Sequence, residues 1–170
     1  MLASIVSGFT FLSVLGFSIP FFRSLFPART DEYYLDIDVG KLRPGLSRKL
    51  NWLGRSVLLV ARSDAQVEEL SKANRKDLLD PDSKSSSQPE YARNQNRSRR
   101  PGYFLAFSNC THLGCEVMLD ASRGFNCPCH KSSFDAAGRI RRGGAAKRNL
   151  EIPEYRFITP NKIRLVYKRS

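Results

Sequence analysis

Two short segments rich in cysteine and histidine constrain this chain more than any other part of its 170 residues. The first reads Cys-Thr-His-Leu-Gly-Cys over residues 110–115, and the second reads Cys-Pro-Cys-His over residues 127–130. All four cysteines and both histidines of the sequence lie in these segments, which we call box one and box two. Thiolate and imidazole are soft or borderline metal ligands, so the concentration predicts a metal centre built from two loops.

Six candidate ligands are more than one tetrahedral ion can use. A [2Fe–2S] cluster with two cysteines on one iron and two histidines on the other uses four of them. The remaining two cysteines are then available for a disulfide between the boxes. The alternative is a structural zinc site of Cys2His2 or Cys3His type, which is common for short Cys/His clusters. Zinc does not need the two extra cysteines, and Cys-x-His is an unusual zinc knuckle, so the pattern favours the iron–sulfur cluster.

The two boxes closely resemble the cluster-binding boxes of the Rieske iron–sulfur subunits of cytochrome bc complexes, in particular those of proteobacterial ubiquinol–cytochrome c reductases. The resemblance implies one [2Fe–2S] cluster per chain, with two cysteine and two histidine ligands, namely Cys110, Cys127, His112 and His130. It also implies a disulfide between Cys115 and Cys129. One of the two ligand histidines is expected to contact the quinol, and the motif does not say which.

The resemblance also implies roles for residues beside the ligands. Leu113, Gly114 and Pro128 are expected to cover the cluster and to form a docking surface. Ser132 is expected to donate a hydrogen bond to a bridging sulfide. Phe134 stands where relatives often carry a tyrosine that donates to a ligand sulfur, and losing that donor is expected to lower the reduction potential.

Two positions depart from the family pattern. Lys131 follows box two, where the family usually has glycine. The sequence Gly-Gly-Ala-Ala-Lys over residues 143–147 replaces a proline-rich loop that shields the cluster, and without prolines we expect this loop to be more flexible. Neither departure touches a ligand, so they concern the docking surface and the stability of the cluster.

The charge of the chain favours an acidic or anionic partner, since 28 Lys+Arg against 16 Asp+Glu give a formal net charge of +12. The bases fall in short scattered clusters, so we do not expect a nucleic acid partner. Two clusters of basic residues, at 97–100 and 139–148, are consistent either with solvated loops or with a surface that attracts an acidic cytochrome. The expected disulfide implies an oxidising compartment, and a bacterial periplasm fits.

The N-terminal segment from Leu2 to Phe22 is uncharged and mostly apolar, and ends at Arg23. As a helix it would be about 32 Å long, enough to span a bilayer. We expect a transmembrane anchor at residues 1–22, a hinge or tether at 23–32 and a Rieske domain at 33–170. A cleaved signal peptide is the alternative, but the segment lacks a basic start and a small-residue cleavage site. The family usually carries a twin-arginine signal just upstream, and this sequence does not.

The remaining chain predicts an all-β antiparallel domain with a small cluster-binding subdomain at about residues 108–148. Strands are expected from apolar alternation and short apolar runs, at residues 33–39, 50–52, 56–61, 103–107, 117–119, 155–158 and 163–167. Ser63 followed by Gln66 predicts a capped helix that ends near Lys72. Residues 80–100 look disordered by composition. They resemble an insertion of proteobacterial Rieske subunits, so we expect them to be ordered around the base of the domain.

The resemblance implies the iron–sulfur subunit of a quinol–cytochrome c oxidoreductase, an enzyme that works as a complex. Such a subunit takes an electron, coupled to a proton, from quinol at cytochrome b and passes it to cytochrome c1. Ubiquinol is expected in preference to menaquinol, in a dimeric complex of the bacterial inner membrane with the cluster domain in the periplasm. The alternatives are a Rieske subunit of another membrane or periplasmic oxidase, and a membrane-anchored zinc-binding protein.

Overall fold

The computed structural model describes residues 16, 18–22, 32–120 and 123–168. The chain divides into two units, residues 33–167 and a second unit made of residues 1–32 with 168–170. The anchor predicted at residues 1–22 and the tether predicted at 23–32 lie mostly outside the described residues, although residues 16 and 18–22 are helical. Within the described parts of the chain, no helix combines the length and apolar character needed to cross a membrane.

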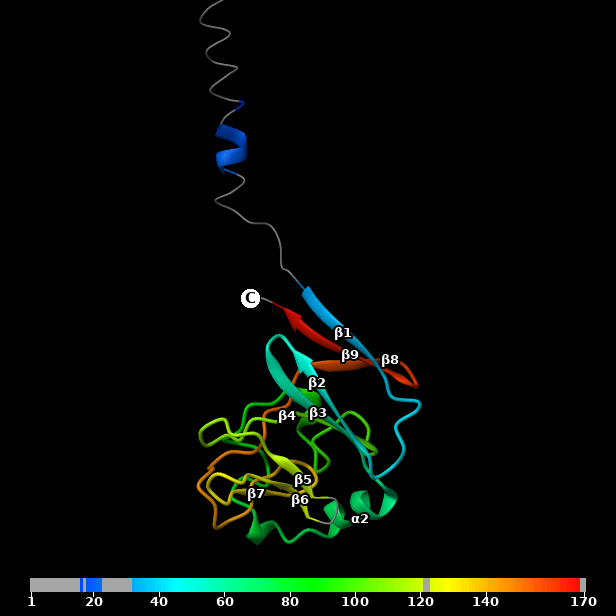
Figure 1. The fold of residues 1–170 in the computed structure, drawn as a ribbon, viewed down its shortest axis with the longest axis vertical. Helices are drawn as coiled ribbons and strands as arrows, with labels where there is room; N and C mark the ends of the chain where they lie inside the picture. The colour runs from blue at the N-terminus through cyan, green and yellow to red at the C-terminus, as the bar shows by residue number, and fades with distance from the viewer. Residues whose placement is uncertain (1–15, 17, 23–31, 121–122, 169–170) are drawn as a thin grey trace, which may run out of the picture. The chain divides into compact units, whose positions relative to one another are not determined.

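The larger unit contains three three-stranded sheets (Figure 1). One sheet has the order β1-β9-β8 and is formed by Glu32–Asp38, Lys162–Lys168 and Tyr155–Thr159. The next has the order β2-β3-β4, with strands at Ser47–Trp52, Arg55–Ala61 and Tyr103–Phe107. The last has the order β5-β6-β7, with strands at Met118–Asp120, Gly124–Asn126 and Ser133–Phe134. The pairings within the last two sheets and between β8 and β9 are antiparallel, which confirms the predicted mostly-β fold.

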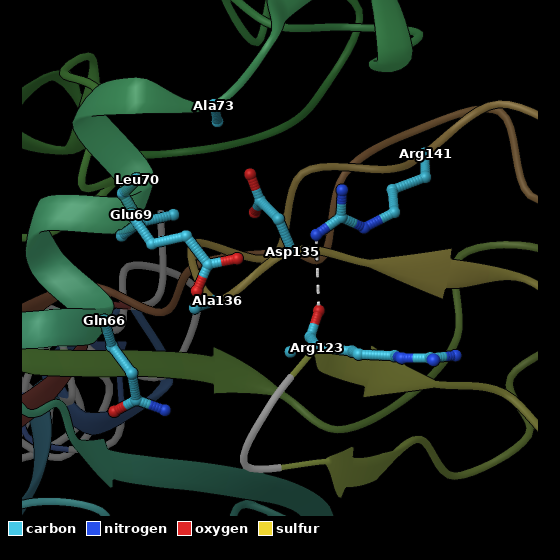
Figure 2. Close-up of a pocket in the computed structure, with 9 residues that line it drawn as sticks. Gln66, Glu69, Leu70, Ala73, Arg123, Asp135, Ala136 and Arg141 are labelled. Atoms are coloured by element: carbon cyan, nitrogen blue, oxygen red, sulfur yellow. Dashed lines mark hydrogen bonds between the residues drawn. The ribbon is translucent and has the colours of Figure 1, made fainter.

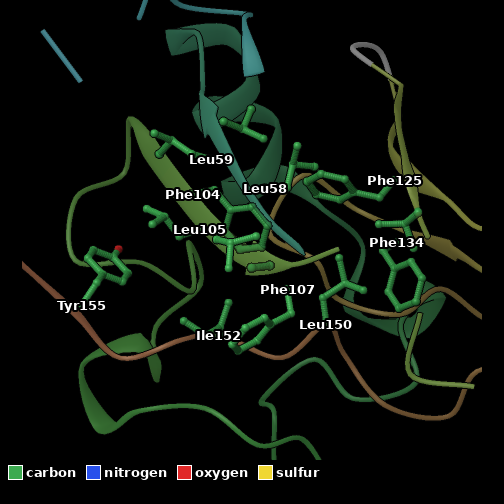
Figure 3. Packing of buried hydrophobic residues seen from close by; sticks show 14 of the residues in the cluster. Leu58, Leu59, Phe104, Leu105, Phe107, Phe125, Phe134, Leu150, Ile152 and Tyr155 are labelled. Atoms are coloured by element: carbon green, nitrogen blue, oxygen red, sulfur yellow. The ribbon is translucent and has the colours of Figure 1, made fainter. Parts of the chain in front are cut away.

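Strands β3 and β4 form the centre of the hydrophobic core. Residues 57–61 and 104–107 are buried without interruption, as expected for strands that are covered on both faces. Figure 3 shows how side chains from these strands pack with Phe125 and Phe134 of the third sheet. The rings of Phe104 and Phe125 lie 5.6 Å apart between centroids. The sheet that carries box two is therefore fixed to the core by aromatic packing.

Helix α2, Asp64–Lys72, begins as predicted. The backbone N–H of Gln66 donates to the Ser63 hydroxyl at 3.3 Å, and the Ser63 N–H donates to the Gln66 side-chain carbonyl at 2.9 Å. This reciprocal capping box satisfies two donors that a helix start otherwise leaves unpaired. The helix ends at Lys72, so both of its predicted ends are confirmed.

Residues 80–100 adopt a defined, largely irregular conformation that includes one short 3-10 turn, Glu90–Ala92. The segment packs against residues 137–150 through the buried guanidinium of Arg97. That group donates to the backbone carbonyls of Ala137, Gly138 and Leu150 at 3.0, 3.1 and 2.7 Å. The predicted order is confirmed, and its cause is a set of hydrogen bonds that composition does not reveal.

The two basic clusters expected at the surface are partly internal. Arg97 and Arg139 are only 1% and 3% exposed. Arg139 forms a buried ion pair with Asp135 at 2.6 Å. Irregular backbone leaves carbonyl groups that need donors, and a guanidinium supplies five N–H groups in one side chain. For these two arginines, the expectation of a solvated or partner-steering role was therefore wrong.

Candidate metal centre

Box one and box two each form a closed loop at the end of a strand. Box one follows β4, where the N–H of Cys110 donates to the carbonyl of Cys115 at 2.7 Å and the N–H of Gly114 donates to that of Cys110 at 2.9 Å. Box two directly follows β6, and the N–H of Cys127 donates to the carbonyl of Ser132 at 2.8 Å. Because the loops are closed by backbone bonds, their side chains are held at fixed positions.

A third loop, residues 143–148, is held against both boxes. The Thr111 hydroxyl of box one donates to the carbonyl of Arg148 at 2.6 Å. The N–H of Ala146 donates to the hydroxyl of Ser132 at 2.9 Å. A side chain at Gly144 would place its Cβ 2.6 Å from the Cα of Ser132, so this close approach needs glycine. We call residues 109–115, 127–131 and 143–148 the tip loops.

The four cysteines separate into two pairs. Cys115 and Cys129 are joined by a disulfide, which confirms the expected pairing. Cys110 and Cys127 are free thiols and are each 3% exposed. Burial raises the pKa of the Cys110 thiol, whereas a backbone hydrogen bond at His112 and the hydroxyl of Ser132 act in the opposite direction. The sulfurs of Cys115, Cys127 and Cys129 lie within 4.8 Å of one another, but two of them are in the disulfide and cannot act as thiolate ligands.

The two histidines lie next to each other on the surface. Both are exposed, and their rings are 4.7 Å apart between centroids with an angle of 86° between the ring planes. The two histidines belong to different boxes. The disulfide joins these boxes, and the third loop bonds to Thr111 and Ser132, so these contacts hold His112 and His130 close together. The available donor set is thus two buried thiols and two adjacent imidazoles. This set fits the ligand chemistry of a [2Fe–2S] cluster with mixed ligands, and it excludes a Cys3His zinc site because Cys115 and Cys129 are oxidised.

The other predicted site residues fall into exposed and buried groups. Leu113 in box one is 71% exposed, and Pro128 in box two is exposed as well. Gly114 has a φ of +80°, which its turn in box one requires. Ser132 is buried and bonded as described above, whereas the Phe134 ring is wholly buried in the core, where Figure 3 shows it beside Phe125.

Lys131 has a φ of 54°, a left-handed conformation that suits glycine and costs another residue about 1 kcal/mol. This backbone position explains why glycine is usual there in the family that the boxes resemble. The side chain of Lys131 is exposed.

The hydrogen bonds that Thr111 and Ala146 donate could not be predicted from the sequence. The Gly-Gly pair at residues 143–144 was the only local sign of close packing.

A pocket on another part of the unit lies between helix α2 and the turn regions of the third sheet (Figure 2). Its lining includes Glu69, Leu70, Arg123 and Arg141, and Arg141 donates to the backbone carbonyl of Arg123 at 3.4 Å. No cysteine or histidine lines this pocket. The metal-ligating chemistry of the described chain is therefore concentrated at the tip loops.

Comparisons with known proteins identify the family. Residues 92–156 match the model of the Rieske [2Fe-2S] domain. The chain is 36% identical over 159 residues to the ubiquinol-cytochrome c reductase iron-sulfur subunit of Allochromatium vinosum, covering 85% of this chain and 76% of that protein. It is 33% identical over 131 residues to the mitochondrial cytochrome b-c1 complex subunit Rieske-1 of Arabidopsis thaliana, covering 76% of this chain and 44% of that one.

A solved structure shares the fold of this chain. The structure matches a chain of a hyperthermophilic respiratory Complex III with a TM-score of 0.57 and 21% identity, covering 96% of this chain and 99% of that one. The family is shown by the 36% identity to the Allochromatium vinosum subunit over most of both chains. This chain belongs to the Rieske iron–sulfur subunits of ubiquinol–cytochrome c reductase.

Proposed function

We propose that this chain is the electron-transfer subunit of a quinol–cytochrome c oxidoreductase and holds one [2Fe–2S] cluster at the tip loops. In this proposal Cys110 and Cys127 bind one iron, and His112 and His130 bind the other. The observation that supports this proposal is that the six cysteine and histidine side chains fall into three pairs. Two thiols are free and buried, two are joined in a disulfide, and the two imidazoles are adjacent and exposed.

The chemistry follows from the two kinds of ligand. When bound, such a cluster accepts one electron at a higher potential than an all-cysteine cluster, because two neutral imidazoles replace two thiolates. Burial of Cys110 and Cys127 keeps water from the sulfur side of the site. The exposed rings of His112 and His130 offer nitrogen atoms at the surface, where a quinol hydroxyl can form a hydrogen bond. A ligand imidazole whose outer nitrogen carries no proton would accept the quinol proton, while the cluster would take the electron.

The partners follow from the relatives. The Arabidopsis relative is a subunit of the cytochrome b-c1 complex, so we infer that this chain works with cytochrome b and cytochrome c1 in a dimeric complex. The substrate is ubiquinol, by analogy with the reductase of Allochromatium vinosum. The chain spans about three quarters of that relative and about half of the mitochondrial ones.

The proposed location combines the sequence with the disulfide. Residues 1–22 form a single-pass anchor in the bacterial inner membrane, residues 23–32 form the tether, and residues 33–170 form the Rieske domain. The disulfide between Cys115 and Cys129 supports an oxidising compartment, so the domain lies in the periplasm.

EPR spectroscopy of membranes that contain the full chain tests the proposal. After reduction with ascorbate we expect a rhombic spectrum of a high-potential [2Fe–2S] cluster, and Cys127→Ser should abolish it. A signal that appears only with dithionite would retain the cluster but contradict quinol oxidation. The absence of a signal, together with one zinc and no iron per chain, would reject the cluster itself.

A further inference from the structure

Asn149 follows the third loop directly and is held by hydrogen bonds to two other segments. Its backbone N–H donates to the hydroxyl of Ser86 at 2.8 Å. Its side-chain nitrogen donates to the carbonyl of Asp80 and to the hydroxyl of Ser83, each at 2.8 Å. Its side-chain oxygen accepts the backbone N–H of Ile140 at 2.8 Å. Asn149 is 1% exposed, so water cannot replace these partners while the segments stay in place.

The turn at residues 80–86, which supplies three of these partners, is itself closely bonded. The carboxylate of Asp80 accepts two backbone N–H groups of the turn, at 2.7 and 3.1 Å, and the hydroxyl of Ser86 at 2.6 Å. Ser83 has a φ of 53°, a left-handed conformation that is unfavourable for a residue with a side chain. A strained residue of this kind persists only where the surrounding structure holds it. The turn is therefore a fixed support for Asn149.

Asn149 brings this support to the edge of box one. The carbonyl of the preceding residue, Arg148, accepts the hydroxyl of Thr111 at 2.6 Å. A hollow of about 190 Å³ lies beside this contact, and its lining includes Ser87, Thr111, Asn149 and the buried Cys110. The hollow is large enough for several water molecules. If the third loop moved away from Thr111, this hollow would open toward Cys110.

The third loop has little of its own to restrict its backbone. It contains no proline, and it begins with Gly143 and Gly144. Its contacts with the boxes include the bond from Ala146 to Ser132 and the bond that Arg148 accepts. A fixed residue at the end of the loop lowers the conformational entropy that is lost each time these bonds form. The bonds of Asn149 therefore favour the closed position of the loop.

We propose that Asn149 is a positioning residue that fastens the third loop to the 80–86 turn and so keeps the loop closed over the cluster site. The hydrogen bonds of Asn149 supply the restraint that a proline-rich loop would carry in its own backbone. The order of the loop is a property of the protein alone, whereas protection of the cluster rests on the proposed function.

The test uses the full chain, purified in detergent together with its partner subunits. Asn149→Ala removes the side-chain bonds. Ser86→Ala removes one partner from the turn and leaves residues 143–150 unchanged, so it serves if Asn149→Ala folds poorly. Ile163→Ala is the control for a general loss of stability. Ile163 is buried in β9, whose sheet carries none of the tip loops, and its truncation leaves a cavity there.

The first readout is hydrogen exchange of residues 143–148, followed by mass spectrometry under native conditions. We expect exchange to become at least about tenfold faster in Asn149→Ala and in Ser86→Ala, since a buried group that loses its partner shifts the opening equilibrium by about this factor. Ile163→Ala should lower the thermal midpoint but leave this exchange at the wild-type rate, because local opening of the loop does not require global unfolding.

The second readout is the rate at which an iron chelator removes the cluster, followed by visible circular dichroism. Asn149→Ala and Thr111→Val should each accelerate the loss. The double variant should lose the cluster no faster than the quicker single variant, because both changes act on the contact between Arg148 and Thr111. When Thr111→Val is combined with Ile163→Ala, the two effects should multiply, as expected for independent sites.

Wild-type exchange of residues 143–148 in both Asn149→Ala and Ser86→Ala would overturn the inference. So would equal acceleration of this exchange in Ile163→Ala, or effects of Asn149→Ala and Thr111→Val on cluster loss that multiply, because Asn149 would then contribute only general stability. An absent [2Fe–2S] signal in the wild type is a different result, which rejects the proposed function. The exchange measurement on the same protein then still decides whether Asn149 holds the third loop.

Discussion

Ser132 joins the third loop to the proposed cluster site through a single hydroxyl. It forms a hydrogen bond with the sulfur of Cys110 and accepts one from the N–H of Ala146. Ser132 is 1% exposed, so water cannot replace either partner without rearrangement of the loops. At the scale of one residue, this hydroxyl links the electronic properties of the site to its packing.

We predict that Ser132→Ala lowers the reduction potential of the cluster. Hydrogen bonds to the sulfurs stabilise the reduced, more negative state. Loss of one such bond is worth about 1 kcal/mol, which for a one-electron couple is about 40 mV. An EPR-monitored redox titration measures the change, with Ser133→Ala as the control at the neighbouring position. An equal potential in wild type and Ser132→Ala would show that the hydroxyl does not act on the cluster.

At the scale of elements, the close approach of β6 to β7 depends on Gly124, the first residue of β6. Its φ is +104°, and a Cβ built there would lie 2.3 Å from the carbonyl oxygen of Phe134 in β7. We expect Gly124→Ala to lower the free energy of unfolding by more than about 3 kcal/mol, because the strain of a positive φ and the steric overlap of the new Cβ with β7 both destabilise the fold. Gly143→Ala, with a φ of +98° and no atom within 4 Å, should cost only about 1 to 2 kcal/mol. Thermal loss of the visible circular dichroism of the cluster measures both.

The contact between residues 80–100 and 137–150 depends on Arg97. We predict that Arg97→Ala destabilises the domain by at least about 3 kcal/mol, since several buried carbonyls lose their donor together. Arg93→Ala is the control, because its ion pair with Glu90 is exposed and should contribute less than about 1 kcal/mol. Hydrogen exchange should show the loss first at residues 137–150. Equal stability of the two variants would contradict the role given to Arg97.

Features with a local cause could be predicted from the sequence. The capping box of α2 needs only Ser63 and Gln66. Strand β4 was predicted from a short apolar run, and it begins and ends at the predicted residues. The disulfide followed from a resemblance in two short boxes. The burial of Arg97 could not be predicted, because the carbonyls it bonds lie 40 to 53 residues away in an irregular segment. The bond from Thr111 to Arg148, 37 residues apart, was missed for the same reason.

At the scale of the whole molecule, exposed ion pairs connect separate segments of the chain. Arg164 in β9 bonds both carboxylate oxygens of Asp36 in β1, at 2.6 and 2.8 Å, across 128 residues of sequence. Arg75 pairs with Asp82 in the insertion. The hydrogen bond from Arg164 lowers the pKa of Asp36 below its ordinary 3.8, and the one from Arg75 lowers the pKa of Asp82 in the same way.

These shifts give the sign of the dependence of stability on pH. A carboxyl group with a lower pKa in the folded state holds fewer protons there than in the unfolded chain between the two pKa values. Its contribution is complete above the unfolded pKa, near 3.8 for aspartate, and disappears as the pH falls through the folded pKa. The buried Arg62 does not contribute to this acid dependence. Burial lowers its pKa to about 10, so its charge does not change at neutral or acidic pH.

We therefore predict that Asp36→Asn lowers the urea midpoint of unfolding at pH 7 and that the difference from the wild type shrinks once the pH falls below the unfolded pKa of aspartate, near 3.8, and disappears as the pH passes through the lower folded pKa, where the wild-type carboxyl is protonated as well. The size of the effect should fall as salt is added, because the pair is accessible to solvent. Glu69→Gln is the control, since Glu69 forms no ion pair within the described residues and should show no such pH dependence. A difference between Asp36→Asn and wild type that stays constant from pH 7 down to acidic pH values at which the wild-type carboxyl is protonated would mean that the asparagine disturbs β1 itself, and the ion pair would then not be the link between the first and last strands.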